Sequence, residues 1–99
     1  MSTLLSESEI ADGLVRLSNW KLSEDQTSIS TSFELADFVA ALDLVNRVGR
    51  EAEQRNHHPD IDIRWNTVTL VLSTHSAGGL TAADLELAGR INEVADQPG

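Results

Sequence analysis

The residues best suited to proton-transfer chemistry in this chain are its three histidines, His57, His58 and His75. An imidazole titrates close to neutral pH, so a histidine can donate or accept a proton there without much tuning. A reaction that takes a proton from one atom and delivers one to a leaving hydroxyl needs two such groups. General acid–base catalysis is therefore the first hypothesis for this sequence.

The positions of the histidines favour a single pocket. His57 and His58 lie at the break between a predicted helix and a predicted strand, and His75 follows a second predicted strand. If these strands pair as an antiparallel hairpin, the start of the first lies beside the end of the second. Glu53 lies four residues before His57, so on a helix the two share a face, and we expect Glu53 to orient that imidazole.

Two other uses of the histidines stay open. Three imidazoles in one place could hold zinc with an open fourth position. Against this, the neighbours His57 and His58 would both have to turn toward one ion, and we expect no metal site. A binding module without catalysis is the second alternative.

The helices that would position these residues begin at recognisable caps. Ser6 with Glu9 and Thr81 with Asp84 each have the spacing of a capping box, which predicts a first helix and a last helix. The cap explains Asp84 fully. Between them, a stripe with helical spacing predicts a long helix that runs toward residue 56; its members are Leu35, Phe38, Leu42, Val45 and Gly49. Pro59 cannot continue this helix, and we interpret it as structural.

The strands are predicted from alternating apolar and polar residues. A short strand over 20–23 and a longer one over 29–35 form one hairpin, and 61–65 with 68–72 form another, with a turn near Asn66. We expect Trp20 and Trp65 to be core aromatics. The order αββαββα predicts an α+β fold, a four-stranded antiparallel sheet with three helices packed on one face.

Length and composition limit the remaining possibilities. The chain has 99 residues, 40% of them hydrophobic, which predicts one domain over 1–99 with an ordered core of about 5–95 and a frayed tail over 96–99. Without cysteine it has neither a disulfide framework nor a thiolate metal site.

The net charge of the chain excludes some classes of binding partner. Seven basic against sixteen acidic residues give a net charge of −9, which argues against nucleic acid and against an anionic membrane surface. No apolar run approaches the roughly 20 residues that span a bilayer, and the first ten residues do not form a signal peptide. We expect a cytoplasmic protein.

The spacing of the chemical residues resembles a known family. The run Glu53-x-x-x-His57-His58-Pro59, followed at set distances by Trp65, His75 and Asp84, resembles the signature of pterin-4a-carbinolamine dehydratases. The similarity covers roughly 10–94 and includes Gly78-Gly79-Leu80-Thr81, Leu87-Ala88 and Trp20.

The resemblance implies an activity and an assembly. Members of this family are hydro-lyases that dehydrate 4a-hydroxytetrahydrobiopterin to quinonoid dihydrobiopterin, recycling the pterin of aromatic amino-acid hydroxylases. They use neither a metal nor an organic cofactor. They form homodimers or homotetramers in which the sheet extends across subunits.

The resemblance also implies roles for individual residues. It assigns His57, His58 and His75 to catalysis, and we take His57 and His75 as the principal acid–base pair. The residues implied to bind the pterin or to support the site are Glu53, Asn56, Pro59, Trp65, Ser73, Thr74, Ser76 and Asp84. The sequence departs from the family pattern at Trp65, where Tyr or Phe is usual, at Ile61, often Trp, and at Ser76, often acidic.

Overall fold

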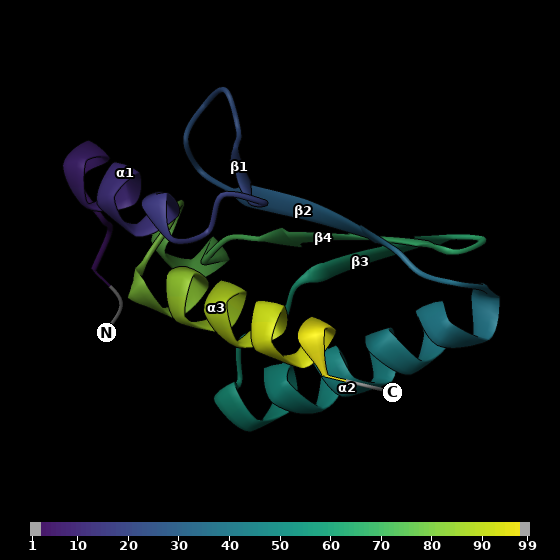
Figure 1. Ribbon diagram of the computed structural model, residues 1–99. Coiled ribbons are helices and arrows are strands. Elements are labelled where there is room, and N and C mark those ends of the chain that lie inside the picture. The colour runs from purple at the N-terminus through teal and green to yellow at the C-terminus, as the bar shows by residue number, and fades with distance from the viewer. Residues whose placement is uncertain (1–2, 98–99) are drawn as a thin grey trace.

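A computed structural model describes residues 3–97. The elements follow one another as α1 (Glu7–Val15), β1 (Lys21–Leu22), β2 (Ile29–Glu34), α2 (Phe38–Arg55), β3 (Asp60–Arg64), β4 (Thr67–Leu72), the 3₁₀ helix η1 (His75–Ala77) and α3 (Ala82–Asp96) (Figure 1). The predicted α+β class and the αββαββα order are confirmed.

The four strands form one antiparallel sheet in the order β1-β2-β4-β3. Two register pairs matter for function: Ile29 of β2 lies opposite Leu72 of β4, and Asp60 of β3 lies opposite Val71. The starts of β2 and β3 therefore flank the end of β4. The chain that leaves β4 toward His75 passes between the residues that precede the two neighbouring strands.

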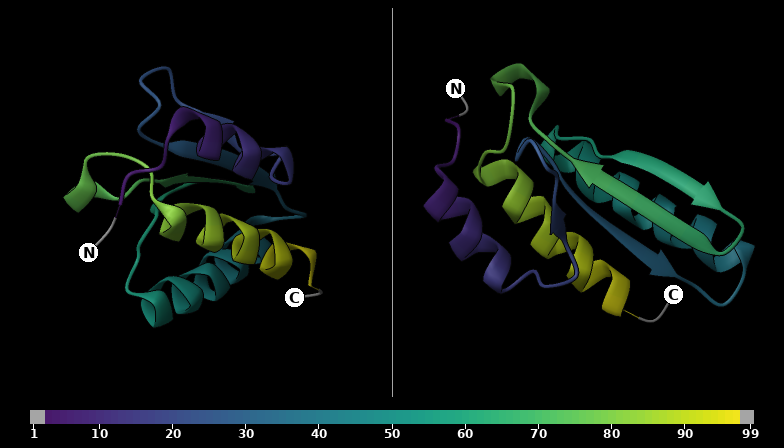
Figure 2. Two further views of the ribbon diagram at one scale, coloured as in Figure 1. Left: turned by 90° about the vertical axis from the view of Figure 1, so that its left-hand side faces the viewer. Right: turned by 90° about the horizontal axis from the view of Figure 1, so that it is seen from above.

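One face of the sheet is covered by helices and the other is open. Val68, Leu70 and Leu72 of β4 are fully buried, and α2 and α3 lie side by side beneath them (Figures 1 and 2). Helix α1 lies alongside α3, and a Cβ at Gly13 would clash with the Leu85 side chain. All the buried hydrophobic residues belong to a single cluster.

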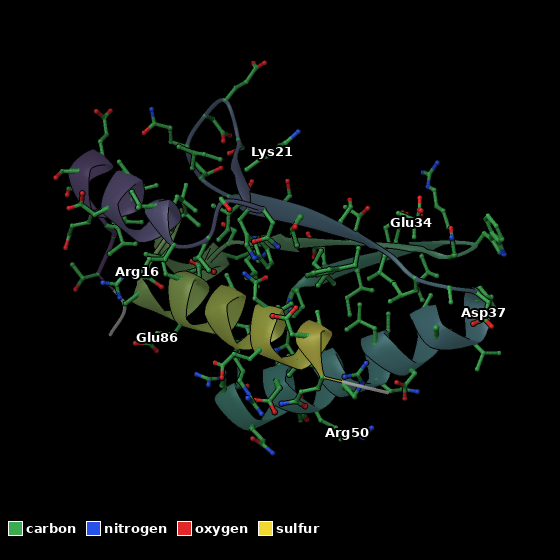
Figure 3. The ribbon with its side chains drawn as sticks, viewed as in Figure 1. Arg16, Lys21, Glu34, Asp37, Arg50 and Glu86 are labelled. Carbon is green, nitrogen blue, oxygen red and sulfur yellow. The ribbon has the colours of Figure 1, made fainter. Side chains whose placement is uncertain are left out.

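Charged side chains project from both outer surfaces. Lys21 and Glu34 point away from the helix-free face of the sheet, whereas Arg50 and Glu86 point away from the far side of the helices (Figure 3). None of the helices within residues 3–97 is long and apolar enough to cross a bilayer.

The caps form as the sequence predicts. The Ser6 hydroxyl accepts from the Glu9 amide at 3.1 Å while Glu9 Oε1 accepts from the Ser6 amide at 2.8 Å. Helix α2 ends at Arg55, and Asn56 caps it in the left-handed conformation with φ 50°. This turn directs the following residues out of the helix, toward the first turn of α3.

The predicted apolar stripe of α2 is confirmed at Leu35 and Val45, which pack against the core, and is wrong at Phe38 and Leu42. The buried residues are Ala41, Leu44, Val48 and Ala52, whereas Phe38 and Leu42 remain 47% and 39% exposed. Two of these four buried residues are alanines, which add little to a hydrophobic pattern. A pattern weighted toward large side chains therefore selects a face rotated away from the true one.

The two tryptophans differ in environment. Trp20 is 4% exposed and donates from Nε1 to Asn92 Oδ1 at 3.0 Å, so its expected place in the core is confirmed. The same expectation for Trp65 is wrong, because this residue is 71% exposed. Strand β3 stops at Arg64, and Trp65 begins the two-residue turn to β4 with φ 50°.

The predicted frayed tail is only partly described. Asp96 is the last residue of α3, and Gln97 is its C-terminal cap. Residues 98 and 99, which belong to the predicted tail, lie outside the described residues.

Candidate active site

The most buried charged group in the described chain is the carboxylate of Asp84, in the first turn of α3. Its Oδ2 accepts from the Thr81 amide at 2.9 Å, as the predicted capping box requires, and from Thr74 Oγ1 at 2.8 Å. Its Oδ1 is 2.6 Å from His57 Nε2. A fully buried carboxylate is costly unless it is hydrogen-bonded, and three donors meet this requirement.

The Asp84 carboxylate fixes the state of His57. A carboxylate only accepts hydrogen bonds, so in this contact His57 Nε2 is the donor and Nδ1 is the ring's other nitrogen. No buried side-chain nitrogen or oxygen within residues 3–97 lacks a partner. Because no residue of 3–97 bonds His57 Nδ1, this atom reaches the molecular surface. The arrangement is an imidazole that is 14% exposed and is oriented by a fully buried carboxylate.

His58 also has a carboxylate partner, but in solvent. Its Nε2 lies 2.8 Å from Glu53 Oε1, and the two side chains are 56% and 81% exposed. The expectation that Glu53 orients His57 is therefore wrong. Helix α2 ends at Arg55, so the four-residue helical spacing does not extend to His57, which turns toward α3 instead.

His75 lies in a cleft of about 380 Å³. The cleft is at the end of the sheet where the starts of β2 and β3 flank the end of β4. Its lining residues are Thr27, Ser28, Asp60, Val71, Ser73, His75 and Gly78. Val71 alternates with the buried Leu70 and Leu72, so the cleft lies on the helix-free side of β4.

One wall of the cleft is the loop between β1 and β2. Ser73 Oγ donates to the Thr27 carbonyl at 2.7 Å, which ties this loop to the end of β4. Within the loop, Asp25 accepts from the Thr27 amide and hydroxyl and from the Ser23 hydroxyl. The bond from Thr27, followed by that from Ser23, holds the pKa of Asp25 below its usual value. The wall is thus held by hydrogen bonds at both ends.

A depression of about 420 Å³ lies elsewhere, between the segment before α1 and the start of α3. Glu9 is the one ionisable residue among those that line it, and Glu9 already caps α1. This depression lacks the groups for acid–base chemistry.

The sequence matches a model of a known family. The family described as pterin 4 alpha carbinolamine dehydratase matches residues 3–94. The chain belongs to this family. The resemblance predicted from the histidine signature is confirmed, and with it the class of hydro-lyases.

Relatives of this dehydratase family cover almost the whole chain. A protein of Nocardia farcinica that carries the pterin-4-alpha-carbinolamine dehydratase name is 53% identical over 92 residues, which are 93% of this chain and 95% of the relative. A protein of the same name from Chloroflexus aurantiacus is 49% identical over 90 residues, 91% and 95% of the two chains.

Solved structures agree on the fold. A transcriptional coactivator/pterin dehydratase from Brucella melitensis superposes with a TM-score of 0.89 at 32% identity, covering 94% of this chain and 99% of that one. A pterin dehydratase-like RuBisCO assembly factor of the alpha-carboxysome superposes with a TM-score of 0.68 at 16% identity, covering 81% and 93%, which shows the shared fold alone.

The dehydratase signature residues divide into two connected groups. His57, Thr74 and Asp84 form the buried network, while Ser73 and His75 line the cleft. Thr74 joins the groups, because its side chain bonds Asp84 and its chain neighbours face the cleft. Thr74 is 6% exposed, so it supports the site from behind.

The remaining predicted residues lie around these groups. Asn56 is the exposed cap of α2, Pro59 separates His58 from β3, and Ser76 is exposed in η1. Trp65 lies apart from them. It follows the far end of β3, whose five residues span about 16 Å, so this chain does not bring it to its own histidines.

Sequence reasoning missed five residues of the cleft: Val71 and Gly78, and three at the starts of the neighbouring strands, Thr27, Ser28 and Asp60. Strand order was the signal that could have found the last three. Once β2 and β3 both pair with β4, the residues at their starts must flank Ser73.

The zinc alternative finds no set of ligands in the described chain. Within residues 3–97, no group of three or more His, Asp or Glu side chains is arranged to hold a metal ion.

Proposed function

We propose that this protein dehydrates a pterin-4a-carbinolamine, 4a-hydroxytetrahydrobiopterin, to quinonoid dihydrobiopterin and water by histidine acid–base catalysis. The observation that carries the proposal is the His57–Asp84 contact of 2.6 Å, in which a fully buried carboxylate orients an imidazole with one nitrogen free. Membership of the dehydratase family supports the choice of substrate.

The reaction balances with two proton transfers. A base removes the proton from N5, the N5–C4a double bond forms, and the C4a–O bond breaks as an acid protonates the departing hydroxyl. No electrons are exchanged with a partner, so the proposed chemistry requires neither a metal nor an organic cofactor. Each positioned proton transfer typically contributes about 10²- to 10⁴-fold in rate.

His57 and His75 are the proposed principal pair. His57 takes the N5 proton at Nδ1, and the buried Asp84 then stabilises the resulting imidazolium. His75, which lines the cleft, protonates the hydroxyl. His58 is more than half exposed and has an auxiliary role in binding.

The wider role is part of the same proposal. Recycling of a pterin cofactor after aromatic hydroxylation, in the cytoplasm, is the setting in which such a dehydratase is useful. The alternative role is a binding module without turnover, which a stable macromolecular partner together with no acceleration of the dehydration would favour.

We also propose that the active form is a homodimer or homotetramer. Phe38, Val39, Leu42 and Trp65 leave apolar surface exposed. The chain brings them to one end of the molecule, since Asn66 and Leu35 are joined by hydrogen bonds of 2.8 and 2.9 Å. Exposed apolar patches of this kind mark interaction surfaces. Sedimentation of the intact chain should give a dimer or tetramer, and a monomer at all concentrations would contradict this.

The direct test follows absorbance as enzymatically generated 4a-hydroxytetrahydrobiopterin decays to the quinonoid product. The intact protein should accelerate the decay above its spontaneous rate, and His57→Ala and His75→Ala should each reduce kcat at least tenfold. Circular dichroism of each variant controls for folding. A decay rate unchanged by the intact protein would overturn the proposed function.

A further inference from the structure

One carboxylate in the cleft is not used by the proposed proton transfers. Asp60 opens β3 and is the one acidic residue among those that line the cleft. The next acid along the strand, Asp62, is paired with Arg64 Nε at 3.2 Å, whereas Asp60 has no such partner within residues 3–97. Its carboxylate is therefore free to accept hydrogen bonds from a ligand.

The sheet register fixes where Asp60 points. It lies directly opposite Val71, and residues opposite each other in an antiparallel pair project to the same face. Val71 and Ser73 are two residues apart on β4 and its extension, and both line the same cleft. Asp60 therefore lines the same cleft as Ser73 and His75, from the neighbouring strand.

The other walls leave little choice for the orientation of a planar ring. The Ser73 hydroxyl already donates its proton to the Thr27 carbonyl. Thr27 and Ser28 belong to the loop that is tied down by this bond. Among the lining residues, Asp60 therefore supplies the one carboxylate and His75 the one imidazole.

We propose that Asp60 determines substrate specificity by binding the pyrimidine edge of the pterin. A pterin presents two adjacent donors on this edge, the 2-amino group and N3–H, which match the two oxygens of one carboxylate. Charge-assisted hydrogen bonds of this paired kind are about twice as strong as neutral ones. With this edge on Asp60, the fused ring carrying N5 and C4a extends toward His75. The inference rests on the proposed function.

The test uses Asp60→Asn with Asp62→Asn as its matched control. Both changes remove one negative charge from the same face of β3, but Asp62 does not line the cleft. We expect Asp60→Asn to raise KM at least tenfold while kcat changes less than about twofold, because the lost contact binds substrate and transition state alike. Asp62→Asn should leave both constants unchanged.

A binding readout separates this inference from the catalytic one. The equilibrium affinity for pterin is compared with that for lumazine, in which an oxo group replaces the 2-amino group. The intact protein should prefer pterin at least tenfold, and Asp60→Asn should lose this preference. Equal preference in both proteins, with turnover intact, overturns the role of Asp60 alone. If the intact protein neither binds nor dehydrates a pterin, the proposed function falls as well.

Discussion

His57 and His58 are neighbours in the chain, and each contacts a carboxylate through Nε2, yet the two pairs lie in opposite environments. The His57–Asp84 side chains are 14% and 0% exposed, and the carboxylate accepts two further hydrogen bonds. The His58–Glu53 side chains are 56% and 81% exposed, and their contact of 2.8 Å lies in solvent.

The difference shows that a contact acquires a function from its surroundings. An ion pair in water competes with hydration and is worth little. In the buried pair, water cannot replace the carboxylate, so His57 has one orientation and one free nitrogen. The helix cap at Asn56 produces this division, because it sends His57 toward α3 and leaves His58 beside the exposed end of α2.

The largest expected effect comes from removing each imidazole in turn. His57→Gln should lower kcat by about 10²-fold or more, since a positioned proton acceptor is lost. His58→Gln, its neighbour and control, should change KM more than kcat. Steady-state kinetics with matched circular dichroism spectra measures both. Equal losses of kcat would mean that burial does not distinguish the two residues.

Removing the carboxylate of each histidine pair should change the stability of the protein by different amounts. Asp84→Ala leaves the donors of His57, Thr74 and Thr81 unsatisfied in the interior, and we expect a loss of about 3 kcal/mol in unfolding free energy. Glu53→Ala should cost less than about 0.5 kcal/mol, as surface changes usually do. Urea denaturation measures both, and similar midpoints would contradict the buried network.

Removing the Thr74 hydroxyl, which bonds Asp84 of the buried pair, should have a smaller effect on the free energy of unfolding. Thr74→Val keeps the shape of the side chain but removes the hydrogen bonds to Asp84 Oδ2 and Thr81 Oγ1, both 2.8 Å. We expect a destabilisation of about 1–2 kcal/mol. Thr69→Val, which loses one bond to Ser32 on the open sheet face, is the control and should change stability by less. A larger destabilisation by Thr69→Val than by Thr74→Val would show that Thr74 does not support the His57–Asp84 pair.

The smallest effect concerns a third ion pair, which joins α2 to α3 with intermediate exposure. The hydrogen bond from Arg90 holds the pKa of Glu51 below its ordinary value of 4.5. A carboxylate whose pKa falls on folding stabilises the protein above its unfolded pKa and loses this contribution as the pH falls through the folded pKa. Glu51→Gln should therefore lower the Tm slightly at pH 7 and not at pH 3. A Tm difference unchanged between these pH values would refute the pairing.

Much of the fold follows from local sequence signals. The capping boxes at Ser6 and Thr81 and the alternation over β2 and β4 are properties of neighbouring residues, so they identify the elements correctly. The buried face of α2 does not follow, because Ala41 and Ala52 supply half of its buried residues and small side chains contribute little to a hydrophobic pattern.

The candidate site, too, is predicted by local sequence signals only in part. The spacing identifies the three histidines and Asp84, but a local rule links Glu53 to the wrong imidazole, because the helix ends before His57. Local signals do not predict the cleft residues Thr27, Ser28 and Asp60, because only the strand order β1-β2-β4-β3 brings them into one cleft with His75.

The most direct test of the account compares kcat for dehydration in Asp84→Asn and Glu53→Gln, each a neutral replacement of similar shape. We expect Asp84→Asn to lower kcat at least tenfold, because its one amide oxygen is needed by the Thr74 and Thr81 donors and its NH2 group then faces His57 Nε2, which can no longer donate. Glu53→Gln should change kcat less than about twofold. Equal effects, or a larger loss in Glu53→Gln, would contradict the claim that the buried pair carries the reaction.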